Sequence, residues 1–339
     1  MSTFFLSNPI RSLLDQEYRP SILPFRGFAN AFGVHIRGRV VSYVACHQPS
    51  ETDSRRRNAR TMLARFVSNA VPGATVAITY GTATYRLVAD DHGYFDGTLP
   101  IALPQGERTT WHTLTYQVAD HPEVGTLIAT GEVMLPGRSA RLAIVSDVDD
   151  TILVSHATAT LKKVRTMLSE NAHTRMPFEG VSDFYSQLIA EERNPMFFVS
   201  SSEWNLYDFL VDFTCIQELP KAPFLLKTLK GGLLDFLRSG GGSHDHKYEK
   251  IKHLMQTYTD LNFILIGDSG QHDAELYARV AEAFPKRVLA IYIRDVTKQK
   301  RDMEVQQIAA NLPVPTTDML LVPDTSAAEQ HARAHGWVE

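Results

Sequence analysis

The chain has 339 residues, of which 44% are apolar, and a formal net charge of −4 at pH 7. This length is more than one hydrophobic core usually needs, and the apolar fraction is sufficient for two folded domains. The weakly acidic charge excludes a general electrostatic attraction to nucleic acid or to acidic lipid, so any anionic partner needs a local basic site.

Cysteine usage and hydropathy narrow the class of protein further. Cys46 and Cys215 are the two cysteines, and neither belongs to a CxxC pair, which argues against a disulfide framework and against a thiolate zinc site. No window approaches the roughly 18 apolar residues of a membrane-spanning helix, and the N-terminus lacks the pattern of a signal peptide. We therefore expect a cytoplasmic protein, and peripheral contact with a membrane stays open because it needs only a surface patch.

Residues 1–29 form an N-terminal segment, and residues 30–140 carry short alternating apolar runs typical of strands. Turn residues such as Pro72-Gly73 separate the runs. The runs read VHIRGRVVSYV, ATVAITYG, TYRLVADDHGYF, HTLTYQVA and TLIATGEVML. This pattern predicts an antiparallel β-sandwich domain.

Residues 55–66, RRRNARTMLARF, interrupt these strands and read as a helix. Its arginines indicate a solvent-exposed helix face, because runs of charged residues usually lie on such faces. The alternative is a docking patch for phosphate head groups.

From residue 141 to 339, apolar strands alternate with amphipathic helices, which predicts a parallel sheet with helices on both faces. We expect helices around 184–191, from 206, from 247, near 274–284 and over 326–334. Four strands, LAIVSD, FFVS, FILIGD and IYIRD, end on Ser or Asp. Ligands of open α/β sheets bind beyond the carboxyl ends of strands, so these side chains are expected to converge.

The stretch IVSDVDDTIL places Asp147, Asp149 and Asp150 at the end of an apolar strand. Clustered carboxylates repel each other and resist burial unless a cation, polar partners or water offset them. An isolated acidic turn also caps a helix, so this stretch alone leaves both interpretations open.

Three further elements follow in a fixed order. FFVSSS places Ser200 after an apolar run, HDHKYEKI places Lys247 at a helix start, and FILIGDSGQHD places Asp268 and Asp273 after another strand. This order of motifs resembles the haloacid-dehalogenase-like (HAD-like) superfamily of phosphohydrolases. The resemblance implies a Rossmann-like HAD parallel sheet, preceded here by the β-sandwich domain, without a large cap that would close the site.

The resemblance also implies a mechanism. Asp147 attacks phosphorus to form an aspartyl-phosphate, and Asp149 acts as general acid and then as general base. Mg²⁺ is held by Asp147, by the main-chain carbonyl of Asp149 and by Asp268, with Asp273 close by. The metal would offset the clustered carboxylates.

Ser200 or Ser201 and Lys247 would hold the phosphoryl oxygens, while Thr151 would have an orienting role. Several neighbours offer alternatives. They are Ser202 for the hydroxyl, Lys250 and Lys252 for the ammonium, His244 and His246 as ligands of a transition metal, and His272 as a group that touches the site or is simply solvated.

Longer strings resemble one family more closely. VSDVDDTIL, FFVSSSEWNLYDFL, LPKAPFLLKTL, HDHKYEKIKHLM and LIGDSGQHDAELY are similar to the catalytic domain of the fungal actin-patch-associated phosphatidate phosphatases and their bacterial relatives. Glu203 stands in a string where these relatives often carry Pro. The family implies hydrolysis of phosphatidate to diacylglycerol.

Two other functions stay open at this point. One is a phosphatase for a soluble ester or a phosphoprotein, because the motifs recognise only the phosphoryl group. The other is a β-sandwich interaction module joined to a weakly active phosphatase domain. Lys162, Lys163 and Arg165 surround the expected entrance or form a solvated helix face, and the sequence gives no oligomeric state.

Overall fold

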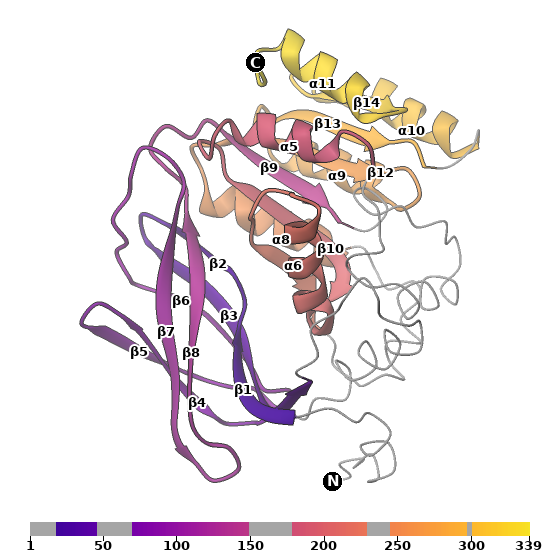
Figure 1. The fold of residues 1–339 in the computed structure, drawn as a ribbon. Coiled ribbons are helices and arrows are strands. Elements are labelled where there is room, and N and C mark those ends of the chain that lie inside the picture. The colour runs from indigo at the N-terminus through magenta and orange to yellow at the C-terminus, as the bar shows by residue number, and fades with distance from the viewer. Residues whose placement is uncertain (1–17, 46–69, 149–177, 229–244, 297–299) are drawn as a thin grey trace.

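The computed structural model describes residues 18–45, 70–148, 178–228, 245–296 and 300–339, which fold around two sheets (Figure 1). Several positions singled out above lie outside these ranges. They are the expected helix at 55–66, the acidic-turn residues Asp149, Asp150 and Thr151, the basic residues Lys162, Lys163 and Arg165, and His244.

The first sheet has eight strands in the order β1-β3-β2-β8-β7-β4-β5, with β6 paired to β3. The strands are β1 (Tyr18–Pro24), β2 (Gly27–Asn30), β3 (Gly33–Ala45), β4 (Thr75–Tyr80), β5 (Ala83–Val88), β6 (Tyr94–Leu99), β7 (Thr110–His121) and β8 (Gly125–Leu135). The alternating runs of the sequence are therefore confirmed as strands.

This sheet differs from the expected sandwich in three respects. Hydrogen bonds join all eight strands into one sheet, so an arrangement of two separate sheets is not confirmed. The β2–β8 pair is parallel, so the sheet is not purely antiparallel. The sheet also begins at β1, before the expected boundary at residue 30. It folds back on itself, since the rings of Phe95 and Tyr116 approach to 5.9 Å within one core.

The second sheet has six strands, all parallel, in the order β11-β10-β9-β12-β13-β14. The strands are β9 (Leu142–Asp147), β10 (Met196–Glu203), β11 (Phe224–Lys227), β12 (Asn262–Asp268), β13 (Val288–Arg294) and β14 (Asp318–Val322). Their near-continuous apolar sequences fit burial on both faces.

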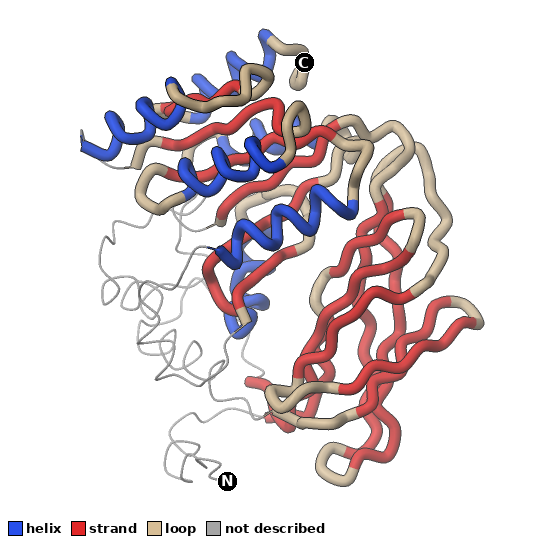
Figure 2. Tube along the Cα trace, turned by 180° about the vertical axis from the view of Figure 1, so that it is seen from behind, coloured by secondary structure: helices blue, strands red, loops and turns tan. Residues whose placement is uncertain are grey.

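Helices lie on both faces of this sheet (Figure 2), and alternate side chains of its strands pack against the two different sets of helices. Ile144 and Phe198 pack with α5 (Val181–Ile189), α6 (Tyr207–Ile216) and α11 (Thr325–Ala334). Val145 and Phe197 pack with α8 (Asp245–Thr257), α9 (Asp273–Ala283) and α10 (Lys300–Ala310). Because successive side chains of a strand point to opposite faces of the sheet, the same strands contribute to two hydrophobic cores. No helix among the described residues is long and apolar enough to cross a bilayer.

Helix α10 was not predicted from the sequence. Its residues, KRDMEVQQIAA, are mostly polar, and Val305 is fully buried against the sheet. A helix that buries so narrow a stripe gives a weak periodic signal.

The two sheets meet through residues 25–30 of the first. Phe25 stacks on Trp204 at 4.3 Å, where the short 3-10 helix η1 (Trp204–Leu206) follows β10. The Arg26 N–H donates to the Tyr207 hydroxyl at 2.8 Å, and the Tyr258 hydroxyl donates to the Ala29 carbonyl at 3.0 Å. Aromatic packing and satisfied hydrogen bonds therefore join the two parts.

Candidate active site

The candidate site lies at the carboxyl ends of β9 and β12, which are neighbours in the parallel sheet. Asp147 is the last residue of β9 and Asp268 is the last residue of β12. After β9 the chain adds β10 and β11 on one side, and it then returns to add β12, β13 and β14 on the other. The connections that leave the two strands therefore diverge, and such a point is where open parallel sheets hold ligands.

Three carboxylates converge there, as the sequence predicts. One oxygen each from Asp147, Asp268 and Asp273 lies within 4.8 Å of the others, and all three residues are fully buried. Asp273 begins α9 and reaches back to the strand end, where its Oδ2 accepts the Asp268 N–H at 3.3 Å. Two strands and one helix thus supply the acidic cluster, defined here as Asp147, Asp268 and Asp273.

Lys247 is the cation that faces this cluster. Its Nζ lies 2.8 Å from Asp147 Oδ1 and 2.9 Å from Asp273 Oδ1, and its side chain is fully buried. The residue belongs to the first turn of α8, and Ile251 and Leu254 anchor that helix in the core. The alternatives for this role are placed elsewhere, because Lys250 donates to the Leu225 carbonyl and Lys252 pairs with Glu249.

The charge state of Lys247 follows from competing effects. Burial lowers the pKa of a lysine, but the adjacent carboxylates of Asp147 and Asp273 outweigh it and raise the pKa of Lys247 above its ordinary value. The side chain is therefore an ammonium at neutral pH.

The loop after β12 is built to hold Asp268. Its Oδ1 accepts the N–H groups of Gly270 and Gln271 at 2.7 and 2.9 Å. Arg301, on the unpredicted helix α10, donates to the carbonyls of Ser269 and Gln271 at 3.2 and 2.9 Å. The missed helix therefore supports the loop that positions a predicted site residue.

Gly267 gives α9 the room to approach. A Cβ at this position would lie 2.6 Å from Asp273 Oδ2 and 2.8 Å from a ring carbon of Tyr277. Any larger residue would push α9, and with it Asp273, away from the cluster. Packing therefore requires glycine at position 267, the first residue of GDSGQHD.

Gln271 is a site residue that the sequence reasoning missed. Its side-chain amide nitrogen, Nε2, donates to Asp147 Oδ2 at 3.3 Å and to Asp268 Oδ2 at 3.2 Å. Its side-chain oxygen, Oε1, accepts from Lys247 Nζ at 3.3 Å. The one signal in the sequence was its place between Asp268 and Asp273. It links carboxylates from both strands to the lysine.

Ser146 and Tyr185 also escaped prediction. The Ser146 hydroxyl donates to the Asp147 carbonyl at 2.7 Å and lies 2.7 Å from the Tyr185 hydroxyl on α5. Burial raises the pKa of Tyr185 above its ordinary value, so the phenol remains protonated. This pair fixes the backbone that carries Asp147.

The candidate hydroxyls lie beside Asp147. Val199 of β10 pairs with Asp147 of β9, so Ser200 is the next residue of β10 beyond the position opposite Asp147. Ser200 is fully buried, and its Oγ accepts the Ser202 N–H at 2.8 Å. The buried Ser201 Oγ has no hydrogen-bond partner among the described residues. The choice between Ser200 and Ser201 stays a prediction.

The remaining candidates are less central. His272 is 63% exposed and lies 3.6 Å from Glu275, so it faces solvent. His246 lines a different cavity, described below, and its predicted partner His244 lies outside the described residues.

The donor set of the acidic cluster fits a hard divalent cation. It offers carboxylate oxygens only, the type of ligand that Mg²⁺ prefers. Three buried carboxylates lie together and Lys247 pairs with two of them, so among these four groups negative charge is in excess. A divalent cation held by Asp147, Asp268 and Asp273 would offset that excess.

A cavity of about 570 Å³ lies where the two sheets meet, and His246, Lys250 and His253 of α8 are part of its lining. Its charged lining is mostly basic, with Arg26, Arg37, Lys227 and Lys250 against Asp96. Phe28, Trp204 and Phe224 give it an apolar part. We call it the basic cavity.

Closely spaced basic side chains mark the basic cavity. Burial and the nearby charges of Arg37, Lys247 and Lys227 lower the pKa of Lys250 to about 7. The buried Nε of Arg37 has no hydrogen-bond partner among the described residues. These features suit an anionic group.

Comparison with known proteins agrees with the family resemblance. Residues 142–295 match the family model of the catalytic domain of phosphatidate phosphatase APP1. The chain is 28% identical to phosphatidate phosphatase APP1 of Saccharomyces cerevisiae over 162 residues, which is 48% of this chain and 27% of that protein. It is 27% identical to an uncharacterized protein of Schizosaccharomyces pombe over 218 residues, 63% of this chain and 35% of that protein.

The chain therefore spans about a third or less of the length of these curated relatives. Among solved structures, a carbohydrate acetylesterase from Xanthomonas citri aligns with 89% of this chain and 68% of its own, at 10% identity and a TM-score of 0.29. That likeness is too low to inform fold or function. The sequence comparisons support an APP1-like phosphatidate phosphatase family for residues 142–295.

Proposed function

We propose that this protein is a Mg²⁺-dependent phosphatase that acts on a phosphomonoester, with phosphatidate or a similar lipid phosphate as substrate. One observation carries the proposal. The carboxylates of Asp147 and Asp268, from two adjacent strand ends, cluster with Asp273, and a fully buried lysine lies 2.8 Å from Asp147, within the segment that matches a phosphatidate phosphatase catalytic domain.

The proposed chemistry assigns a role to each residue of the site. Asp147 is the nucleophile, and its attack forms an aspartyl-phosphate as the ester oxygen leaves. Asp149 donates the proton to that oxygen and later takes one from the hydrolytic water. Lys247 and a hydroxyl of Ser200 or Ser201 hold the phosphoryl oxygens, and Thr151 orients the turn.

Asp147, Asp268 and Asp273 would hold Mg²⁺ together with the Asp149 carbonyl. When bound, the ion would neutralise charge on the phosphoryl group and on the cluster. Gln271 and Lys247 already bridge these carboxylates and keep them close together.

The strand order supports the proposed superfamily. The six strands of this sheet can be numbered along the chain from 1 for β9 to 6 for β14. Their order across the sheet is then 3-2-1-4-5-6, which is the order of Rossmann-like doubly wound sheets. Asp147 and Asp268 then occupy the two strands at the point where the order reverses. This is the place where a HAD-like site is expected.

The basic cavity supports an anionic or amphiphilic substrate. Lys250 follows Lys247 by one turn of α8, so the cavity and the acidic cluster share a helix. Its cations would attract an anionic surface or a second acidic group, while Trp204 and Phe224 would contact apolar parts of the substrate. The protein would reach a lipid substrate as a peripheral protein from the aqueous side.

The decisive experiment measures phosphate release by the full chain from phosphatidate vesicles and from soluble monoesters, with and without Mg²⁺. We expect the higher kcat/KM on phosphatidate, dependence on Mg²⁺, and loss of turnover in Asp147→Asn without loss of the fold. The exposed Asp245→Asn is the matched control.

Each other outcome has a definite meaning. Near-normal turnover in Asp147→Asn would refute the mechanism. Preference for a soluble ester or a phosphopeptide would refute the lipid assignment and retain the chemistry. If no substrate is hydrolysed, the alternative of an interaction module with an inactive phosphatase domain replaces this proposal.

A further inference from the structure

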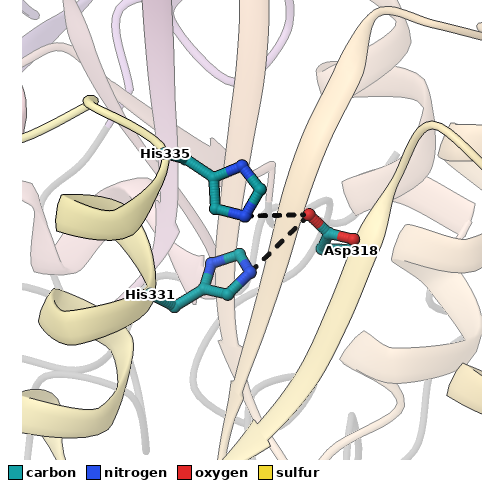
Figure 3. A group of neighbouring side chains, drawn as sticks. All are labelled: Asp318, His331 and His335. Carbon is teal, nitrogen blue, oxygen red and sulfur yellow. Dashed lines mark ion pairs between the residues drawn. The ribbon is translucent and has the colours of Figure 1, made fainter.

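A second cluster of potential metal ligands lies far from the acidic cluster, between β14 and α11 (Figure 3). Asp318 is the first residue of β14, whereas the acidic cluster occupies the carboxyl ends of strands in the same sheet. His331 lies in the last turn of α11 and His335 directly follows that helix as its C-cap, and both rings point toward the Asp318 carboxylate. We propose that these three residues form a site for a transition-metal ion such as Zn²⁺.

The distances within the cluster support a shared ion. The Nε2 atoms of His331 and His335 each lie 3.6 Å from the same oxygen, Asp318 Oδ2. This separation is too long for a good hydrogen bond, whose N···O distance is about 2.7–3.2 Å. Ligand atoms about 2.1 Å from a tetrahedral zinc ion lie about 3.4 Å apart. The spacing is therefore closer to that of ligands around one ion.

The local sequence explains why the histidines face the same way. They are four residues apart at the end of α11, where the His335 N–H donates to the His331 carbonyl at 3.2 Å, so they share one face. The same i and i+4 spacing recurs in helical zinc sites. Their rings approach to 4.5 Å, and His335 stacks on Trp337 at 4.7 Å. Packing thus limits the rotation of His335 before any ion arrives.

His331 has a partner of the kind that metal-bound histidines usually have. Its Nδ1 lies 3.0 Å from the Tyr292 hydroxyl on β13. A hydrogen bond at Nδ1 fixes the ring orientation and leaves Nε2 directed at Asp318. The side chains of His331, His335 and Asp318 are 18%, 44% and 47% exposed, so an ion can enter from solvent.

The donor atoms set the class of ion. Two imidazole nitrogens and one carboxylate suit Zn²⁺, Ni²⁺ or Cu²⁺, whereas Mg²⁺ prefers the oxygen-only acidic cluster. Three protein ligands leave the fourth position to water. Because β14 is the edge strand, an ion here would fasten the C-terminal helix α11 to the edge of the sheet.

The test is a calorimetric titration of ZnCl₂ into the chelator-treated full chain, with Mg²⁺ in excess to saturate oxygen-only sites. We expect one Zn²⁺ per chain in the wild type and binding weakened by at least about tenfold in His335→Gln, because one of three ligands is lost. His121→Gln, a partly exposed histidine at the end of β7, should bind Zn²⁺ like the wild type.

A second readout locates the ion. Zn²⁺ should slow amide hydrogen exchange in α11 of the wild type and of Asp147→Asn, but not in His335→Gln. Equal affinity in His335→Gln and the wild type would overturn the proposal, as would a wild type that binds no Zn²⁺. Loss of binding in Asp147→Asn alone would place the ion in the acidic cluster and would also overturn it. None of these measurements depends on phosphatase activity.

Discussion

Lys247 Nζ lies 2.8 Å from Asp147 Oδ1, and neither side chain is accessible to solvent. The pair joins the first turn of α8 to the end of β9, two elements that are distant in the sequence. A buried charge is costly unless it is paired, so each group stabilises the other in the folded protein. The relationship therefore links the stability of the site to its chemistry.

Replacing Lys247 by Met should impair both stability and turnover. The change leaves buried carboxylates without their ammonium, so we expect the free energy of unfolding to fall by about 3–5 kcal/mol without Mg²⁺ and by less with it. Because the proposed mechanism makes Lys247 a donor to the phosphoryl oxygens, kcat should fall by about 10²–10³-fold. Denaturant unfolding and phosphate release measure the two effects.

Lys252→Met provides the matched control for this prediction. Lys252 is on the same helix but is 38% exposed and pairs only with Glu249 among the described residues. Its loss should change stability by less than about 1 kcal/mol and leave turnover intact. Equal effects of the two substitutions would show that Lys247 has no special part in the site.

Gly267→Ala should disturb the acidic cluster through packing alone. The new Cβ would meet Asp273 Oδ2 at 2.6 Å, and overpacking of this kind costs about 1–3 kcal/mol. We expect lower thermal stability and weaker Mg²⁺ dependence of turnover, since Asp273 is displaced. In Gly97→Ala the nearest atom is a flexible Leu87 methyl at 3.3 Å, so that variant should behave like the wild type. A functional Gly267→Ala enzyme would contradict the geometry.

Lys250→Gln tests whether the basic cavity receives part of the substrate. The ammonium donates to the Leu225 carbonyl, and the glutamine amide can replace that bond while the charge is lost. We expect KM for phosphatidate vesicles to rise several-fold, while kcat for a small soluble monoester stays unchanged. Equal changes on both substrates would mean that Lys250 acts on the catalytic site through Lys247 and not through the cavity.

Acid should weaken the contact between the two sheets through His35. Burial, together with the neighbouring His253, lowers the pKa of His35 from about 6.5 to about 4. The folded protein therefore resists protonation that the unfolded chain accepts, so stability should decline as the pH falls from about 6.5 to about 4. His35→Gln should flatten that decline, and His121→Gln should not. Urea unfolding midpoints at pH 7 and pH 5 provide the comparison.

Much of the candidate site could be predicted, because its residues stand in local sequence patterns. Asp147 and Asp268 close apolar runs, and parallel strands place such ends at one edge of a sheet, so their meeting follows from the pattern. Lys247 and Asp273 were found from their places in the order of motifs, and the apolar face of Ile251 and Leu254 distinguished Lys247 from the neighbouring lysines. The resemblance to a phosphatase family came from the order of these motifs.

Other features depend on contacts that no local pattern encodes. Gln271, Tyr185 and the supporting Arg301 are ordinary polar residues until the fold brings them to the strand ends. Helix α10 buries too little apolar surface to be recognised in the sequence. The basic cavity combines residues of β3, β11 and α8, and the Asp318 cluster joins a strand to a helix.

The sequence by itself determined which strands end in carboxylates and which helix carries the buried lysine, and hence the class of chemistry that we propose. Only the tertiary structure decided how the eight strands of the first sheet connect, where that sheet docks, and which side chains surround the charges. The reason is physical. Hydrophobic periodicity reports on the burial of single elements, whereas hydrogen bonds and ion pairs between distant elements depend on how those elements pack.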